Sequence, residues 1–104
     1  MAIEYGGYGV EVMDVTLDTD PSVKTDIKVS HQDTILVDVL GSYWHETVRQ
    51  KEGHWSTEEI QITKVVVHGH GQVSLDELSR LVPGAEDLIN DEIRREYDRG
   101  ICLL

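Results

Sequence analysis

Histidine is the residue type in this chain whose chemistry and spacing first suggest a site. The five histidines are His31, His45, His54, His68 and His70. In the run His68-Gly69-His70-Gly71, two imidazoles stand two positions apart, so in an extended backbone they face the same side. Zinc needs three or four ligands in a tetrahedron, so His45, His54 or a carboxylate would have to complete such a set. The alternative is a surface turn between a strand and a helix, which we favour because no cysteine pair and no His-Glu-x-x-His motif is present.

Other catalytic chemistry is poorly supported. Cys102 is the sole cysteine, and no Gly-x-Ser-x-Gly turn occurs anywhere in the chain. Asp14, Asp18 and Asp20 lack the spacing and the glycine of a calcium-binding loop. The glycines near the N-terminus neither follow a predicted strand nor precede a predicted helix, as a phosphate-binding loop would require. We therefore predict a non-enzymatic protein with no catalytic residue, no metal and no cofactor.

Acidic residues dominate the charge. The 104 residues include 20 Asp and Glu against nine Lys and Arg, a formal net charge of −11. Such a surface repels nucleic acids and anionic membranes, so we expect neither as a direct partner. The excess either serves solubility or docks on a basic protein surface, including one that normally holds nucleic acid. The first 40 residues hold eight acids against two lysines, which points to the N-terminal strands and turns as the binding face.

Aromatic residues are the second class of candidate contacts. Trp44 and Trp55 flank one predicted turn, so we expect them to be near neighbours across a hairpin. Packing within the sheet is one interpretation, and an exposed anchor at a binding surface, extended by Tyr5 and Tyr8, is the other. With the acidic candidates, the predicted binding residues are Asp14, Asp18, Asp20, Tyr43, Trp44, Trp55, Glu58, Glu59, Glu86, Asp87 and Asp91.

Alternating apolar and polar residues predict the strands that position these side chains. They lie at residues 10–17, 23–29, 34–49 and 55–67, joined by short polar turns, which predicts a four-stranded antiparallel meander. The alternation is cleanest in 23–29, which we expect to form a hairpin with the next strand across residues 30–33. A change of phase near Met13 predicts a bulge, and Gly41 predicts a bulge or bend within one long strand.

The last third of the chain changes to a helical period. Ser74 and Glu77 fit a helix-capping box, and Pro83-Gly84 ends the short helix that follows. A second helix is predicted from Pro83 or Ala85 to about Arg99, with Gly100 as its stop. The chain is thus predicted to be one α+β domain, residues 1–104, whose two C-terminal helices pack on one face of the sheet.

A local resemblance adds an expectation about biological role. Residues 59–67, Glu-Ile-Gln-Ile-Thr-Lys-Val-Val-Val, followed by a turn and Leu75-Asp76-Glu77-Leu78, resemble small acidic bacteriophage accessory proteins, in which such a strand leads into a terminal acidic helix. That class includes anti-CRISPR proteins and DNA mimics. The resemblance implies an inhibitor in the host cytoplasm that occupies a basic surface of a host protein, and it implies no catalytic residue.

Two other functions stay open, as does the oligomeric state. The first is a structural or assembly protein, such as a small virion component, that uses exposed strand edges and tryptophans. The second is a metal-site protein built on His68 and His70. The lone cysteine fits a reducing cytosol, and the sequence has no apolar run of membrane-spanning length and no basic stretch typical of a secretory signal.

Overall fold

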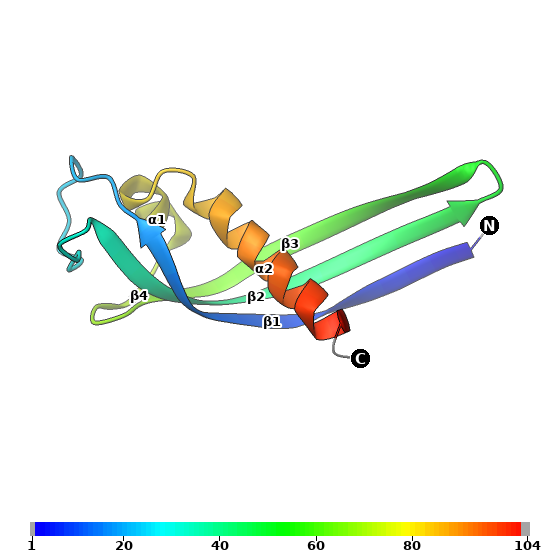
Figure 1. Ribbon diagram of the computed structural model, residues 1–104, viewed down its shortest axis with the longest axis horizontal. Coiled ribbons are helices and arrows are strands. Elements are labelled where there is room, and N and C mark those ends of the chain that lie inside the picture. Colours follow the sequence, from blue (N-terminus) through cyan, green and yellow to red (C-terminus); the bar gives the residue numbers. More distant parts are fainter. Residues whose placement is uncertain (1, 103–104) are drawn as a thin grey trace.

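An antiparallel sheet of four strands, covered on one face by two helices, makes up the fold (Figure 1). The computed structural model describes residues 2–102, apart from the side chains at positions 2, 54, 101 and 102. The strands are β1 (Ala2–Asp18), β2 (Thr34–Gln50), β3 (Gly53–Val67) and β4 (Gly71–Val73), in the order β1-β2-β3-β4. The helices α1 (Leu75–Leu81) and α2 (Ala85–Cys102) follow. The predicted α+β fold with a meander and two C-terminal helices is confirmed.

The core lies between α2 and the inward-facing residues of the sheet. Val37 and Val39 of β2 are buried, and so are Ile89 and Ile93, which lie one helical turn apart on α2. Burial of a side chain of this size contributes about 1.5–3 kcal/mol to folding, so this contact holds the helix on the sheet. Ser74 caps α1 as predicted, because its hydroxyl accepts a hydrogen bond from the backbone N–H of Glu77 at 3.1 Å.

The sheet continues beyond the last turn of α2 as an arm (Figure 1). We define the arm as residues 2–9 and 42–61; it gives the molecule a length of 54 Å against 25 and 20 Å in the other directions. The prediction that the first strand starts at Val10 is wrong, because β1 begins at Ala2. Gly6 and Gly7 have no side chain, and this lets β2 lie close against the first part of β1. A Cβ added at Gly7 would be 2.7 Å from the ring of Trp44.

Both predicted irregularities are present. The register between β1 and β2 shifts between Val12 and Val15, and Asp14 within this bulge has a positive φ of 59°. β2 runs through Gly41 without a break, while its register against β3 shifts between Leu40 and Gly41. The bulge turns the end of β1 towards the helices (Figure 1). We call the end of the molecule that carries α1 and the connection between β1 and β2 the base of the molecule.

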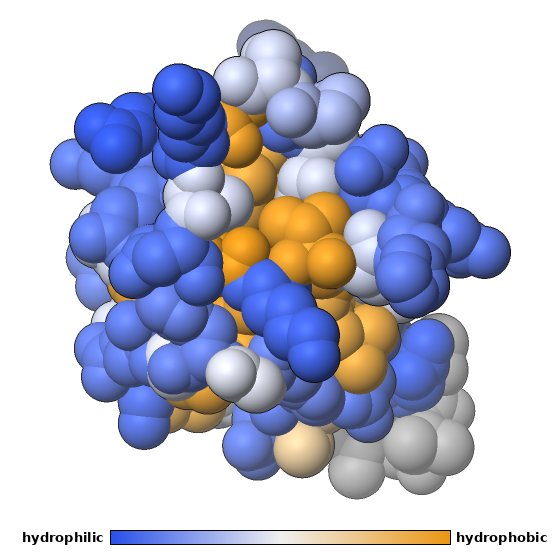
Figure 2. Space-filling model, turned by 90° about the vertical axis from the view of Figure 1, so that its left-hand side faces the viewer, coloured by the Kyte–Doolittle hydropathy of each residue, from blue (hydrophilic) through white to orange (hydrophobic). Residues whose placement is uncertain are grey.

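The predicted strand at residues 23–29, and with it the hairpin across 30–33, is wrong. These residues belong to the connection between β1 and β2, which pair directly with each other. Side chains compete with the sheet for backbone groups here: Asp20 accepts from the N–H of Ser22, and Thr25 accepts from the N–H of Ile27. The alternation arises because Ile27 is buried in the core while the charged residues face solvent. From the base, Figure 2 shows apolar surface ringed by hydrophilic side chains.

The second helix ends later than predicted. Gly100 does not stop α2, which continues to Cys102. A glycine costs about 1 kcal/mol within a helix but does not forbid one. The preceding turn is held on the sheet by Tyr97, whose ring stacks on Tyr43 with centroids 4.1 Å apart. No helix of the described part of the chain combines the length and the apolar character needed to cross a bilayer.

Candidate protein-binding interface

Apolar side chains gather on the face of the arm that the helices leave open. Residues that pair directly across strands share a face of the sheet. Val48 is opposite Ile3 in β1 and opposite Trp55 in β3, so these three form one row across the arm. Tyr5 contacts Trp44 diagonally across β1 and β2, with ring centroids 5.9 Å apart, since Tyr5 is opposite Glu46 and Trp44 is opposite Gly7. We call these five residues the outer aromatic face.

Exposure distinguishes this face from ordinary sheet packing. Tyr5, Trp44 and Trp55 keep 59%, 48% and 53% of their surfaces exposed, while Val48 between them is buried. Large aromatic side chains are usually mostly buried, and exposed apolar patches mark binding surfaces. Trp44 and Trp55 therefore lie on the face of the sheet and outside the core, with about half of each side chain open to solvent. They share a face, but the prediction that they are near neighbours is wrong: Trp44 is opposite Glu59, whereas Trp55 is opposite Val48, four residues further along β2.

The strands that carry this face have open edges. β1 is the first strand of the sheet and has a neighbour on one side only. β4 pairs with Val65, Val66 and Val67 of β3, and among the described residues no strand lies on the outer side of β3 from residue 53 to residue 64. Edge strands present unpaired backbone donors and acceptors to any approaching chain. The arm thus offers both side-chain and backbone contacts.

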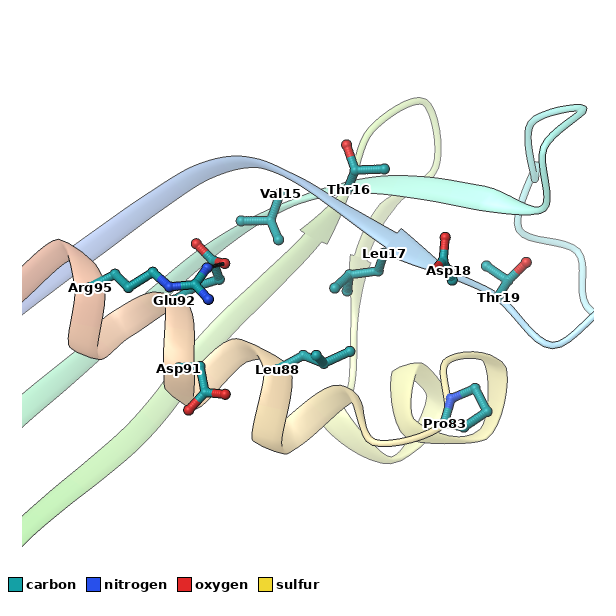
Figure 3. A pocket seen from close by; sticks show the side chains of 10 residues that line it. All are labelled: Val15, Thr16, Leu17, Asp18, Thr19, Pro83, Leu88, Asp91, Glu92 and Arg95. Atoms are coloured by element: carbon teal, nitrogen blue, oxygen red, sulfur yellow. Dashed lines mark hydrogen bonds and ion pairs between the residues drawn. The ribbon is translucent and has the colours of Figure 1, made fainter.

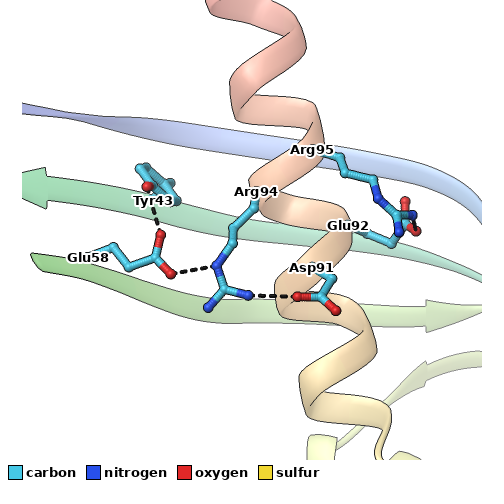
Figure 4. Close-up of polar contacts among 6 residues, drawn as sticks. All are labelled: Tyr43, Glu58, Asp91, Glu92, Arg94 and Arg95. Atoms are coloured by element: carbon cyan, nitrogen blue, oxygen red, sulfur yellow. Dashed lines mark hydrogen bonds and ion pairs between the residues drawn. The ribbon is translucent and has the colours of Figure 1, made fainter. Parts of the chain in front are cut away.

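The opposite face of the arm is fixed to α2 by a polar network (Figure 4). The hydroxyl of Tyr43 donates to Glu58 at 2.8 Å, and the Nε of Arg94 donates to the other oxygen of the same carboxylate. Arg94 also donates from Nη1 to Asp91 at 2.7 Å. Burial raises the pKa of Glu58, but the hydrogen bonds from Tyr43 and Arg94 outweigh it, and the net pKa is lowered. The carboxylate therefore stays ionised and holds the base of the arm in place.

Two tyrosines complete this inner face. Burial, followed by the hydrogen bond to Glu58, raises the pKa of Tyr43 to about 12. The hydroxyl of Tyr97 lies 2.9 Å from the Nδ1 of His45, and its ring contacts Tyr8 at 5.0 Å between centroids. Tyr43 stays protonated at neutral pH and acts as a hydrogen-bond donor to Glu58. Tyr43, a predicted binding residue, therefore lies on the inner face of the arm, where its hydroxyl binds Glu58 and its ring stacks on Tyr97 of α2.

His68 lies at the bulge of β1, on the side of the sheet away from the helices. Its Nε2 lies 2.8 Å from Asp38 and 3.6 Å from Asp14, and Asp38 also accepts the backbone N–H of Asp14 at 2.8 Å. The hydrogen bond to Asp38 raises the pKa of His68, and the N–H of Asp14, followed by His68, lowers the pKa of Asp38. We call these three residues the bulge clasp.

The bulge clasp changes the metal hypothesis. Among the described residues, Asp14, Asp38 and His68 are the three potential ligands that lie within 4.8 Å of one another, and His70 and His45 are not among them. The predicted set around His68 and His70 is therefore not assembled. The hydrogen bonds of Asp38 with His68 and with the backbone N–H of Asp14 explain why these three residues lie together. The side chains of His54 and Cys102 lie outside the described residues.

Replacement of His68 with glutamine is expected to reduce the pH dependence of stability near neutrality. A raised pKa in the folded state adds stability that is complete below the ordinary histidine value of about 6.5 and is lost as pH rises through the folded value. Urea unfolding at a series of pH values measures this. His31→Gln is the control, because His31 is exposed and has no ion pair within the described part of the chain. Equal pH profiles for His68→Gln and wild type would contradict the role of the clasp.

The predicted acidic contacts do not form one surface. Asp14 belongs to the bulge clasp, and Glu58 and Asp91 are tied to Arg94. Asp18 ends β1, and Asp20 accepts hydrogen bonds from Ser22. Glu86 and Asp87 occupy the first turn of α2. Among the predicted acidic residues, Glu59 is the one that lies opposite Trp44 on the arm. Ile3 and Val48 of the outer aromatic face were not predicted; only the register of β1 on β2 brings them together.

Comparison of the chain with protein-family models, with curated proteins and with solved structures gave no match.

Proposed function

We propose that this chain is a non-enzymatic binding protein that docks on a protein partner through the outer aromatic face of its arm. The supporting observation is that two tryptophans and a tyrosine are about half exposed on one side of an element that extends from the body. Tryptophan and tyrosine contribute disproportionately to binding energy when a partner buries them. The polar network beneath α2 fixes the arm before binding, which lowers the entropy lost on association.

The surroundings of this face indicate the chemistry of the partner. Glu46 and Glu59 lie on this face, directly opposite Tyr5 and Trp44. Glu4 and Glu58 lie on the other face of the arm, where they pair with Arg49 and Arg94. An apolar centre within acidic surroundings fits a partner that has an apolar cleft bordered by basic residues. A phage-encoded inhibitor that occupies a basic surface of a host protein in the host cytoplasm, as the resemblance implies, is the form of this function that we favour.

The salt dependence of the binding kinetics tests this division between an apolar centre and charged surroundings. The partner is first captured from host lysate and identified by mass spectrometry. We expect that raising NaCl from about 0.1 M to about 0.5 M slows association by about tenfold and changes the dissociation rate by less than about twofold. A dissociation rate that rises steeply with salt would show that acidic contacts hold the complex, and would contradict docking through the aromatics.

An assembly protein is the second candidate function, because β1 and much of β3 have open edges. Edge-to-edge pairing or pairing of two outer aromatic faces would produce a symmetric oligomer. The net charge of −11 opposes such self-association, so we expect a monomer. Light scattering at several protein concentrations separates the two functions: a stable oligomer supports the assembly function and argues against a free arm.

A further inference from the structure

A groove separates the end of β1 from α2 (Figure 3). Val15 and Leu17 of β1 point into it from one side and Leu88 of α2 from the other, while Thr16 and Asp18 point away from the helix. The hollow has a volume of about 450 Å³. It adjoins a second hollow of about 550 Å³ that continues between β1 and the next turns of α2 and shares Val15 with the first. Volumes of this size are typical of ligand-binding clefts.

The strand that forms one wall of this groove is an edge strand. β2 occupies one side of β1, and in the described part of the chain no strand pairs with its other side. Alternate N–H and C=O groups of such a strand point away from the sheet. A chain added to this edge would direct every second side chain into the groove, against Val15, Leu17 and Leu88. The bulge at Asp14 limits the regular pairing to residues 15–18, or about 13 Å of strand.

The charges around the groove indicate which kind of chain fits. Among the described residues, the carboxylates that line the two hollows are Glu11, Asp14, Asp18, Asp91, Glu92 and Glu96. The cationic residues are Arg95 and Arg99, and each is ion-paired within α2, with Glu92 and Glu96. Glu11 and Asp18 have no ion-pair partner in the described part of the chain. The groove therefore attracts a cationic segment.

We propose that an extended basic segment of a partner protein adds to the edge of β1 at residues 15–18. Its alternate apolar side chains occupy the groove between β1 and α2, and its lysines or arginines face Asp18 and Asp14 on the other side of the strand. This site lies at the base of the molecule, so it is separate from the outer aromatic face. It gives the chain a second contact surface, one that recognises the main chain as well as the side chains of its ligand.

A synthetic nine-residue peptide that alternates lysine with leucine, labelled with a fluorophore, tests the site on the full chain. We expect saturable binding by fluorescence anisotropy and slower hydrogen exchange of β1 amides within residues 15–18 of isotope-labelled protein. Leu88→Lys should weaken binding by at least about tenfold, because it places a cation where an apolar side chain of the peptide packs. Leu40→Lys is the matched control: Leu40 is 43% exposed against 45% for Leu88, but it lies on the opposite face of the sheet.

A second peptide separates strand addition from simple attraction between charges. Methylation of alternate backbone nitrogens keeps the charge of the peptide but removes the donors that a strand needs, so it should abolish binding. If Leu88→Lys does not fold, Asp18→Lys tests the same segment of β1 from its other, exposed side, where the lysines of the peptide would lie. Absence of binding, or binding that survives N-methylation or the groove variants, would overturn the proposal. Trp44→Ser/Trp55→Ser protein should bind the peptide normally, so this test is independent of the arm.

Discussion

Replacement of Trp44 and Trp55 together with serine is expected to lower the affinity for the protein partner by roughly 30-fold to 1,000-fold, since one buried aromatic anchor contributes about 2 kcal/mol and two contribute up to about 4 kcal/mol. Both side chains are about half exposed in the free chain, so their loss removes little packing within the molecule. Binding and folding are therefore separable at these positions. The effect should appear mainly as faster dissociation of the complex.

Surface plasmon resonance with the captured partner measures this loss, and circular dichroism checks that the double variant is folded. Leu40→Ser is the matched control, because Leu40 is a large exposed apolar residue on the same face of the sheet but outside the arm. It should bind as wild type does. Unchanged affinity of the tryptophan double variant would show that the outer aromatic face is not the interface. The acidic residues outside the arm would then be the remaining candidates.

Replacement of Gly41 with alanine is expected to destabilise the fold by about 1–3 kcal/mol, the range typical of overpacking a core. An added Cβ would lie 2.6 Å from the backbone oxygen of Gln61 in β3 and 3.0 Å from Cδ1 of Ile93 in α2. The oxygen belongs to the backbone of a paired strand and Ile93 is fully buried, so neither can move without disturbing the sheet or the core.

Urea unfolding followed by circular dichroism should show a midpoint lowered by roughly 1–2 M for this variant. Gly9→Ala is the control, because the nearest atom to its added Cβ is the oxygen of Gly41 at 4.0 Å, and its stability should change by no more than about 0.5 kcal/mol. Equal midpoints for the two variants would show that α2 and β3 do not lie as close to Gly41 as described.

The candidate interface was predictable in its residue types but not in its geometry. The residue types alone favour Trp44, Trp55 and Tyr5 as contacts, because tryptophan and tyrosine are common at interfaces. Their exposure depends on where α2 crosses the sheet, and nothing local to a strand encodes that position. Ile3 and Val48 are distant in sequence and become neighbours only through the pairing of β1 with β2.

The acidic candidates show the limit of arguments from composition. The net charge of −11 predicted an acidic binding face, but many of the carboxylates have structural partners, such as Arg94 for Glu58 and Asp91. Others cap a turn or clasp the bulge, as Asp20 and Asp38 do. A count of charges does not show which of them are paired, because pairs such as Glu58 with Arg94 form between elements that are distant in the sequence.

Local patterns in the sequence by themselves determined the α+β class, the cap at Ser74, the bulge near Met13, the continuity of β2 through Gly41 and the buried face of α2. Each depends on residues within one or two turns or strand repeats, so propensity and periodicity are sufficient. Tertiary structure decided that residues 23–29 form a connection and that the glycine-tyrosine segment joins the sheet. It also decided that His68 meets Asp38 rather than His70. These outcomes depend on which strands pair and which neighbours fill the remaining space, and such long-range contacts outweigh the preference of a short segment.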